Sequence, residues 1–451
     1  MSEKRSSFTG KIGFVLAAAG SAVGLGNIWR FPYLAAKYGG GIFLLTYIVL
    51  AVTFGFALLC TEIAIGRKTG KSAIDAFRAL DKRFSFLGWI ASLIPILILS
   101  YYSVIGGWVI KYFSVYLTGN YHKAVSEGFF DGFISSPAEP LVWFFVFMAF
   151  TALIVLFGVE KGIEKVSKIM MPVLIVLTLF IAVYTMFMPG AMKGVIYYIK
   201  PDFSKFSFTT LLAAMGQLFY SMSIAMGIMI TYGSYMKKDI NLESSVSYIE
   251  IFDTGIAFLS GLMIIPGVFA FLGEDALGKG AGLMFVTLPK VFDNMRGGAF
   301  IGAAFFLLVF FAAVTSSISL METIVSIFKD KLGWSRKRAC GVIFLISILL
   351  GSLSSLGYGA LSFISIKSMG FYLLEMFDFL TNSVMMPIVA LLTCIFVGYV
   401  VKPKTVIDEM KVCGRFKREG LYVVMIKYIA PVFIVAILIF SLLEAFGVVK
   451  V

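Results

Sequence analysis

Oxygen-bearing side chains lie within strongly apolar stretches of this 451-residue chain. One group is the run 315–317, Thr-Ser-Ser, and a second consists of Asn27, Ser221 and Asp253. Hydroxyl, amide and carboxylate oxygens are hard ligands that suit a cation such as sodium, which needs no histidine or cysteine. The hydroxyls of the first group could instead bond to carbonyls of their own helix. The residue types therefore predict oxygen-lined binding sites for sodium. For the first group, hydrogen bonds to the helix backbone are the alternative.

Small residues interrupt two of the apolar stretches. Residues 20–27 read Gly-Ser-Ala-Val-Gly-Leu-Gly-Asn, and residues 221–227 read Ser-Met-Ser-Ile-Ala-Met-Gly. Glycine adds backbone freedom, and serine can bond to backbone groups that local unwinding releases. Close helix packing through small residues would explain one such break more readily. Two breaks that lie five helices apart indicate instead an inverted-repeat transporter with its binding site at the membrane midplane.

The composition of the chain is that of a multi-pass membrane protein. Hydrophobic residues make up 60% of the chain and charged residues only 14%, and the mean hydropathy is +0.96. A soluble domain is typically about 25% charged. The formal charge of +13 does not indicate a nucleic-acid partner, because the basic residues fall in loops on one predicted membrane face. We expect the lipid bilayer as a partner, no nucleic acid and no enzymatic activity.

Eleven segments are long and apolar enough to cross a bilayer as helices, which takes about 20 residues each. They are 12–36, 42–66, 87–117, 140–157, 168–188, 208–235, 244–272, 298–328, 339–357, 369–400 and 424–447. With the N-terminus in the cytosol, 26 of the 38 lysine and arginine residues fall in cytosolic connections, as the positive-inside rule requires. Eleven spans then place the C-terminus outside the cytoplasmic membrane, and it would lie inside if residues 424–447 did not span. We expect a single integral membrane domain, residues 1–451.

Four ionisable residues, Arg30, Glu62, Asp253 and Asp378, lie deep within the predicted spans. Charged groups inside a membrane are functional by default when they have partners. Glu375 lies three residues before Asp378 and shares its helix face, so either carboxylate could pair with Arg30.

Residues 20–32 carry the most specific motif of the chain, Gly-Ser-Ala-Val-Gly-Leu-Gly-Asn-Ile-Trp-Arg-Phe-Pro. This motif, with the stretches at 216–221, 230–235 and 315–317, resembles the neurotransmitter:sodium symporter family, in particular its bacterial amino-acid transporters. The resemblance covers nearly the whole chain. It implies an all-α, leucine-transporter-like fold of about eleven helices in which the first and sixth are broken. The two inverted repeats would be 12–188 and 208–400, and 424–447 would be an additional helix.

The resemblance implies two sodium sites. The first would use the Ala22 carbonyl with Asn27, Ser221 and Asp253. The second would use the carbonyls of Gly20, Val23 and Ala312 with the hydroxyls of Thr315 and Ser316.

The resemblance also implies a site for a zwitterionic substrate. The substrate carboxylate would meet Leu25, Gly26 and Tyr102, and its ammonium group would meet Ala22, Tyr220, Ser221 and Ser223. Its side chain would lie among Ile98, Tyr102, Tyr220, Met226, Ser316 and Leu320. No charged side chain is placed to meet a charge on the substrate side chain, and an unpaired buried charge is costly. The flexible Met226 favours large apolar substrates, including aromatic ones.

Two gates follow from the same resemblance. The outer gate would be Arg30 with Asp378, and the inner gate would be Arg5 with Asp330, supported by Tyr235. Glu62 would brace the unwound part of the sixth helix.

We therefore expect sodium-coupled symport of neutral, hydrophobic amino acids by alternating access, without a chloride requirement. Asp253 would supply the negative charge that chloride provides in chloride-dependent members. An amine carrier is one alternative, but its family members place an aspartate where this chain has Gly24. An amino-acid sensor on the transporter fold and a passive channel are the others. The candidate gates argue against a sensor, and a channel would show no sodium dependence.

Overall fold

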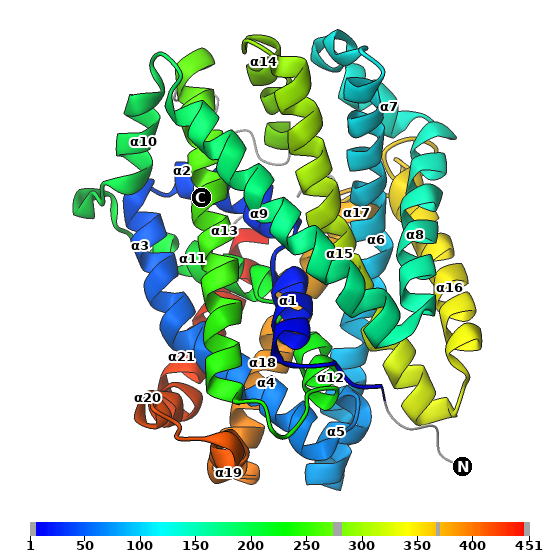
Figure 1. The fold of residues 1–451 in the computed structure, drawn as a ribbon, viewed down its shortest axis with the longest axis vertical. Coiled ribbons are helices and arrows are strands. Elements are labelled where there is room, and N and C mark those ends of the chain that lie inside the picture. The colour runs from blue at the N-terminus through cyan, green and yellow to red at the C-terminus, as the bar shows by residue number, and fades with distance from the viewer. Residues whose placement is uncertain (1–5, 274–281, 367–369, 446–451) are drawn as a thin grey trace.

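The computed structural model describes residues 6–273, 282–366 and 370–445. These residues form a bundle of helices, with a single isolated antiparallel bridge between Ile366 and Phe371 in the described part (Figure 1). The helices are α1 Lys11–Ala22, α2 Phe31–Lys37, α3 Gly41–Leu50, α4 Phe56–Thr69, α5 Ala73–Leu80, α6 Ser85–Leu117, α7 Phe129–Ser135, α8 Glu139–Leu156, α9 Lys165–Met186, α10 Ala191–Ile199, α11 Phe208–Ser221, α12 Ile228–Ser234, α13 Leu242–Phe271, α14 Leu288–Asp293, α15 Gly298–Leu332, α16 Arg336–Leu356, α17 Leu373–Asp378, α18 Met386–Ile395, α19 Lys404–Met410, α20 Glu419–Val424 and α21 Ala430–Ala445.

The described residues contain nine continuous helical spans that are long and apolar enough to cross a membrane, and a bent pair that makes a tenth. Several spans join two labelled helices through a π-helical turn, as α3 and α4 do through Ala51–Gly55. The remaining predicted span, 208–235, is divided into the shorter helices α11 and α12. The prediction of an all-helical membrane protein with broken first and sixth helices is therefore confirmed.

The first break separates α1 from the π-helical segment Gly26–Arg30, which continues into α2. The axes on either side of this break differ by 54°. In the second break, Ser223 and Ala225 have φ angles of 54° and 66°. Left-handed backbone costs a non-glycine residue roughly 1–2 kcal/mol, so contacts around the second break must hold it in place.

Glycines bring α12 into direct backbone contact with α4. A Cβ atom on Gly66 would lie 1.9 Å from the carbonyl oxygen of Ile230, and one on Gly233 would lie 2.3 Å from that of Ile63. Because no side chain fits at either position, the lower part of the broken sixth helix packs closely on α4.

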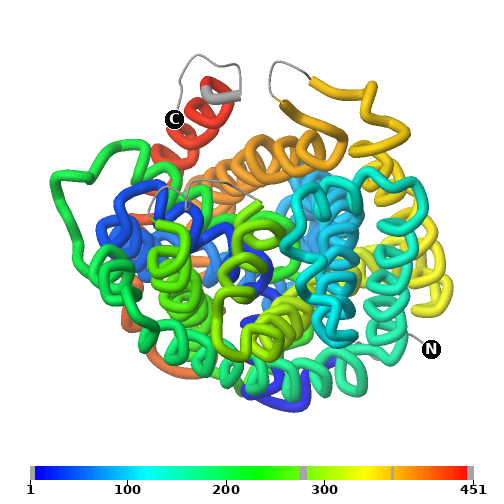
Figure 2. The backbone as a smooth tube through the Cα atoms, turned by 90° about the horizontal axis from the view of Figure 1, so that it is seen from above, coloured from blue at the N-terminus to red at the C-terminus, as the bar shows by residue number. Residues whose placement is uncertain are grey.

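The connections with most of the basic residues gather at one end of the bundle. In Figure 1, α5, α19, α20 and the segment before α1 lie at the lower end, whereas α7, α10 and α14 lie at the upper end. Figure 2 looks along the bundle and shows α16 (yellow) and α21 (red) at its periphery. Leu345, Leu349 and Val432 on these two helices are about two-thirds exposed, as expected of side chains that face lipid. The division into two repeats and an additional helix stays a prediction.

Candidate functional site

A small cavity lies between the two helix breaks, α6 and α15. Its volume is about 30 Å³. Its walls include every residue predicted for substrate binding: Ala22, Leu25, Gly26, Ile98, Tyr102, Tyr220, Ser221, Ser223, Met226, Ser316 and Leu320. Ser21, Gly24, Asn27 and Ile228 complete the lining. The structure thus brings residues from four separate stretches of sequence to one place.

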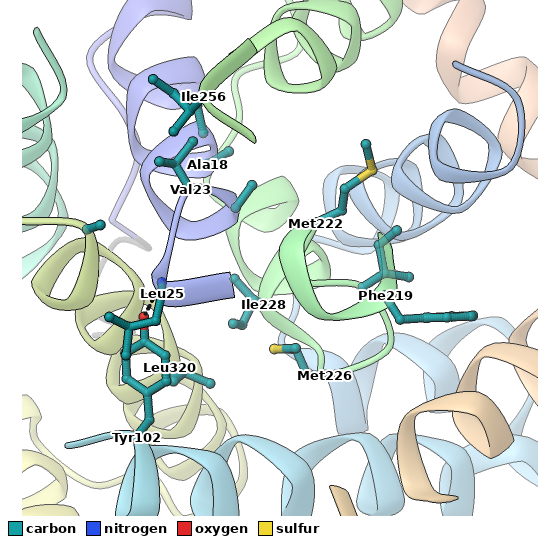
Figure 3. Close-up of a cluster of buried hydrophobic side chains, with 14 of the residues drawn as sticks. Ala18, Val23, Leu25, Tyr102, Phe219, Met222, Met226, Ile228, Ile256 and Leu320 are labelled. Atoms are coloured by element: carbon teal, nitrogen blue, oxygen red, sulfur yellow. Dashed lines mark hydrogen bonds between the residues drawn. The ribbon is translucent and has the colours of Figure 1, made fainter. Parts of the chain in front are cut away.

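The cavity has apolar walls and one polar end. Figure 3 shows Tyr102 and Leu320 on one side and Met226 and Ile228 across from them. The hydroxyl of Tyr102 accepts a hydrogen bond from the Leu25 backbone N–H at 3.2 Å, drawn as a dashed line. The polar end is formed by backbone groups of the first break and by the Tyr102 hydroxyl.

At the first break, the C-terminal end of α1 and the N-terminal end of the next helical segment both lie at the cavity. α1 ends at Ala22, so its terminal carbonyls lack helical partners. Gly26 begins the next helical segment, and the Leu25 N–H before it bonds to the Tyr102 hydroxyl and not to a helical carbonyl. Carbonyls at a helix C-terminus favour cations, and N–H groups at an N-terminus favour anions. A molecule with neighbouring positive and negative groups fits this arrangement.

Serine hydroxyls connect the two broken helices and α15 beside the cavity. The carbonyl oxygen of Ser21 accepts hydrogen bonds from Ser223 at 2.9 Å and from Ser316 at 3.1 Å. The hydroxyls of Ser21 and Ser223 are 3.1 Å apart. Ser21 was not predicted as a site residue, although its place in the first break and its hydroxyl group were visible in the sequence.

The residues predicted for the first sodium site form one buried cluster. The side-chain amide of Asn27 donates to Asp253 Oδ1 at 2.7 Å, and the hydroxyl of Tyr47 donates to Asp253 Oδ2 at 2.7 Å. The hydroxyl of Ser221 lies 2.7 Å from that of Tyr47, and Ala22 lines the adjoining cavity. Asp253 is fully buried, and among the described residues it has no lysine, arginine or histidine partner. A buried carboxylate without a cationic partner is costly, so this cluster suits a cation.

The residues predicted for the second sodium site lie where α1 meets α15. The side chain of Thr315 packs against Gly20, where a Cβ atom would lie 3.2 Å from Thr315 Cβ. Its hydroxyl is 3.1 Å from the Ala312 carbonyl oxygen and 3.0 Å from that of Phe311. Thr315 thus makes bonds to carbonyls of its own helix, which was the alternative to sodium binding. The bond to Ala312 also holds the Thr315 hydroxyl oxygen beside a carbonyl that was predicted as a sodium ligand. Val23, a further predicted ligand, is fully buried.

Glu62 on α4 contacts the second break. Its Oε1 accepts a hydrogen bond from the backbone N–H of Ala225 at 2.6 Å, and the side chain is almost fully buried. Because Ala225 is one of the two left-handed residues, this bond stabilises the least favourable part of the backbone.

The predicted outer-gate residues lie close to the cavity without a direct ion pair. The guanidinium carbon of Arg30 is 5.0 Å from the centre of the Tyr220 ring, which lines the cavity. Asp378 accepts a hydrogen bond from Asn382 at 2.6 Å. Among the described residues no ion pair joins Arg30 to Asp378. Glu375 bonds to Tyr358 and to the backbone N–H of Tyr372.

The predicted inner gate is described only in part, because Arg5 lies outside the described residues. Asp330 accepts a hydrogen bond from the backbone N–H of Ser72 at 2.8 Å. The hydroxyl of Tyr235 donates to Glu322 at 2.8 Å, and Arg336 pairs with both oxygens of Glu322 at 2.6 and 2.8 Å. The pairing of Glu322 with Tyr235 was not predicted, because nothing in the sequence separation of the two residues indicates a contact.

Comparison with known proteins gives one consistent result. Residues 5–127 and 134–448 match the Sodium:neurotransmitter symporter family. The uncharacterized sodium-dependent transporter YhdH of Bacillus subtilis is 34% identical over 97% of this chain and 98% of its own length. An uncharacterized sodium-dependent transporter of Haemophilus influenzae is 31% identical over 98% of this chain and 99% of its own length. The crystal structure of MhsT in complex with L-phenylalanine has a TM-score of 0.88 and 38% identity, and covers 97% of this chain and 100% of MhsT.

The fold and the cavity between two broken helices define a membrane transporter of the leucine-transporter type. The chain belongs to the sodium:neurotransmitter symporter family. It is therefore a multi-pass, sodium-dependent transporter and not an enzyme.

Proposed function

We propose that this protein couples the inward movement of sodium to the uptake of neutral, hydrophobic amino acids, aromatic ones included. The observation that carries the proposal is the cavity itself, which joins opposite helix ends to an apolar wall. Alternating access would follow when the segments around the two breaks move against the remaining helices.

The polar end of the cavity supports an amino acid as substrate. The carboxylate would bind the N–H groups of Leu25 and Gly26 and the hydroxyl of Tyr102, and the ammonium group would bind carbonyls near Ala22 and Ser221. Leu25 and Tyr102 already bond to one another at 3.2 Å, so the proposed donors are close together.

The conformation at Gly24 argues against an amine carrier. A Cβ atom there would lie 2.6 Å from the hydroxyl of Ser316 and 3.0 Å from that of Tyr102. The carriers of amines in this family place an aspartate at this position. Here even a methyl group would require both neighbours to move, so a substrate must bring its own carboxylate.

The apolar end supports a large side chain. Ile98, Met226 and Leu320 are each at least nine-tenths buried in the cavity wall, and none carries a charge. MhsT, which shares 38% of its sequence with this chain, was crystallised with phenylalanine. A charged side chain in this wall would lose its hydration without gaining a partner.

Two sodium ions would bind as cargo. The first would be held by Ala22, Asn27, Ser221 and Asp253 together with the substrate carboxylate, and the second at Thr315 and its neighbours. A sodium ion that completes the carboxylate site raises the affinity for substrate, and the effect is reciprocal. Each charge that crosses a potential of 100 mV contributes about 2.3 kcal/mol, which supports more than tenfold accumulation. The Asp253 carboxylate would make chloride unnecessary.

We further propose that the protein lies in the cytoplasmic membrane with its N-terminus in the cytosol and its C-terminus outside. The support is the gathering of α5, α19, α20 and the segment before α1 at one end of the bundle. The connections at this end hold most of the basic residues, which the positive-inside rule assigns to the cytosol.

A binding screen on the purified protein tests the substrate. Each of the twenty amino acids is measured with sodium and with potassium in its place. We expect sodium-dependent binding of leucine, methionine, phenylalanine, tyrosine and tryptophan, and none of aspartate, glutamate, lysine or arginine. Binding of dopamine-like amines in preference to amino acids would contradict the proposal.

A further inference from the structure

A second groove lies outside the substrate site, where the turn between α8 and α9 meets the segment before α1. It has a volume of about 700 Å³ and is lined by Thr9, Phe157, Glu160, Lys161, Glu164, Lys165 and Lys168. Three of these seven residues are lysines and two are glutamates. Neither the substrate cavity nor the sodium sites share any residue with this groove.

The buried acid in this groove already has its partners. Glu164 is 1% exposed and accepts hydrogen bonds from the backbone N–H of Thr9 at 2.9 Å and from the Thr9 hydroxyl. Lys168 pairs with it at 2.6 Å. Glu164 therefore does not counter the charges of Lys161 and Lys165. Both of these lysines are exposed and have no anionic partner among the described residues.

An apolar stripe continues from the lysines along α9. Ile169, Val173 and Val176 follow Lys165 at intervals of four, four and three residues, so all four lie on one face of the helix. These apolar side chains are 59%, 38% and 64% exposed. Phe157, at the mouth of the groove, is 63% exposed. A basic pocket at the end of a membrane span thus leads directly into a lipid-facing surface.

We propose that this groove binds an anionic phospholipid, with its phosphate on Lys161 and Lys165 and an acyl chain along Ile169, Val173 and Val176. With Glu164 paired to Lys168, the groove holds Lys161 and Lys165 against one further acid, Glu160, and this net positive charge is complementary to a phosphate diester. The order of lysine and apolar residues along α9 matches the order of headgroup and chain in a lipid. A soluble phosphate would use the lysines alone and would gain nothing from the stripe.

Native mass spectrometry of the purified full-length protein tests the proposal. Phosphatidylglycerol and phosphatidylcholine with identical acyl chains are titrated separately, and the dissociation constant of the first bound lipid is measured. We expect wild type to prefer phosphatidylglycerol. Lys161→Gln with Lys165→Gln should weaken phosphatidylglycerol binding by about 30-fold, at about tenfold per 1.4 kcal/mol and about 1 kcal/mol per lysine. Binding of phosphatidylcholine should not change.

A matched variant separates this site from general surface charge. Lys402→Gln with Lys404→Gln removes the same charge from two exposed lysines near α19, and should change phosphatidylglycerol binding by less than threefold. Lys161→Arg with Lys165→Arg should retain the preference, which shows that the glutamine variant lost charge and not its fold. An undiminished preference in the glutamine variant, or an equal loss in both glutamine variants, would overturn the proposal. So would displacement of the lipid by millimolar glycerol phosphate, which would assign the groove to soluble anions.

Discussion

At the scale of single residues, substitution of Thr315 tests the second sodium site most directly. Its hydroxyl lies 3.1 Å from the Ala312 carbonyl oxygen, so one cation can contact both. We expect Thr315→Ala to weaken the sodium affinity by about 10- to 100-fold, because a bond to a charged group contributes about 1.5–3 kcal/mol. The measurement is the sodium dependence of amino-acid uptake in proteoliposomes.

Ser317 provides the matched control for this prediction. Its hydroxyl bonds to the Val314 carbonyl and lies 2.8 Å from that of Thr151, away from α1. Ser317→Ala should leave the sodium affinity unchanged. A Thr315→Ala protein with wild-type sodium affinity would remove Thr315 from the site.

Asp253 carries the prediction about chloride. In wild type, uptake should be the same in chloride and in gluconate, because the Asp253 carboxylate supplies the negative charge beside the first sodium ion. Asp253→Asn keeps the size of the side chain and removes that charge, so its uptake should fall at least tenfold when gluconate replaces chloride. A wild type that stops in gluconate would refute the argument.

Sequence and structure agree closely at this scale where a motif fixes the neighbours. All eleven predicted substrate residues line one cavity. Several lie in the two breaks or the 315–317 run, whereas Ile98, Tyr102 and Leu320 were predicted from the family resemblance alone. Pairs without a motif could not be predicted. The contacts between Thr9 and Glu164, and between Tyr235 and Glu322, join residues far apart in the sequence through tertiary packing alone.

At the scale of helices, the backbone contact between α4 and α12 gives a prediction about stability. Gly66→Ala should lower the midpoint of thermal unfolding by several degrees and reduce uptake. Alanine favours a helix by up to about 1 kcal/mol over glycine, but its Cβ atom would lie 1.9 Å from the Ile230 carbonyl oxygen. Overpacking of this kind costs about 1–3 kcal/mol, so the clash outweighs the gain in helix propensity.

Gly341 on α16 is the control for helix propensity. A Cβ atom there meets no neighbouring atom within 4 Å. Gly341→Ala should leave the unfolding midpoint unchanged or raise it slightly, and uptake should not change. Equal destabilisation by the two substitutions would show that close packing at Gly66 is not the cause.

The two helix breaks show how far sequence reasoning reaches at this scale. Glycine and serine at 20–27 and 221–227 predicted both interruptions, and the structure confirms them. The left-handed backbone at Ser223 and Ala225 was not predictable, because neither residue type favours it. It depends on outside contacts such as the bond from the Ala225 N–H to Glu62.

At the scale of the whole molecule, hydropathy alone predicted most of the spans, since lipid requires every backbone group to be satisfied within a helix. Hydropathy did not predict the short helices α5, α7, α10, α14 and α19. They lie in the connections between spans, which carry no long apolar run. The arrangement of the spans around the cavity was predicted from the family resemblance and not from the periodicity of the sequence.

Concentrative uptake by the purified protein tests the central claim most directly. The protein is reconstituted in liposomes, and labelled phenylalanine is supplied outside with sodium outside and potassium inside. Uptake should rise above the equilibrium level, fall to it when the sodium gradient is dissipated, and compete with unlabelled leucine and tryptophan but not with lysine or glutamate. Uptake that only reaches equilibrium, whether sodium is present or not, would contradict sodium-coupled symport of neutral, hydrophobic amino acids.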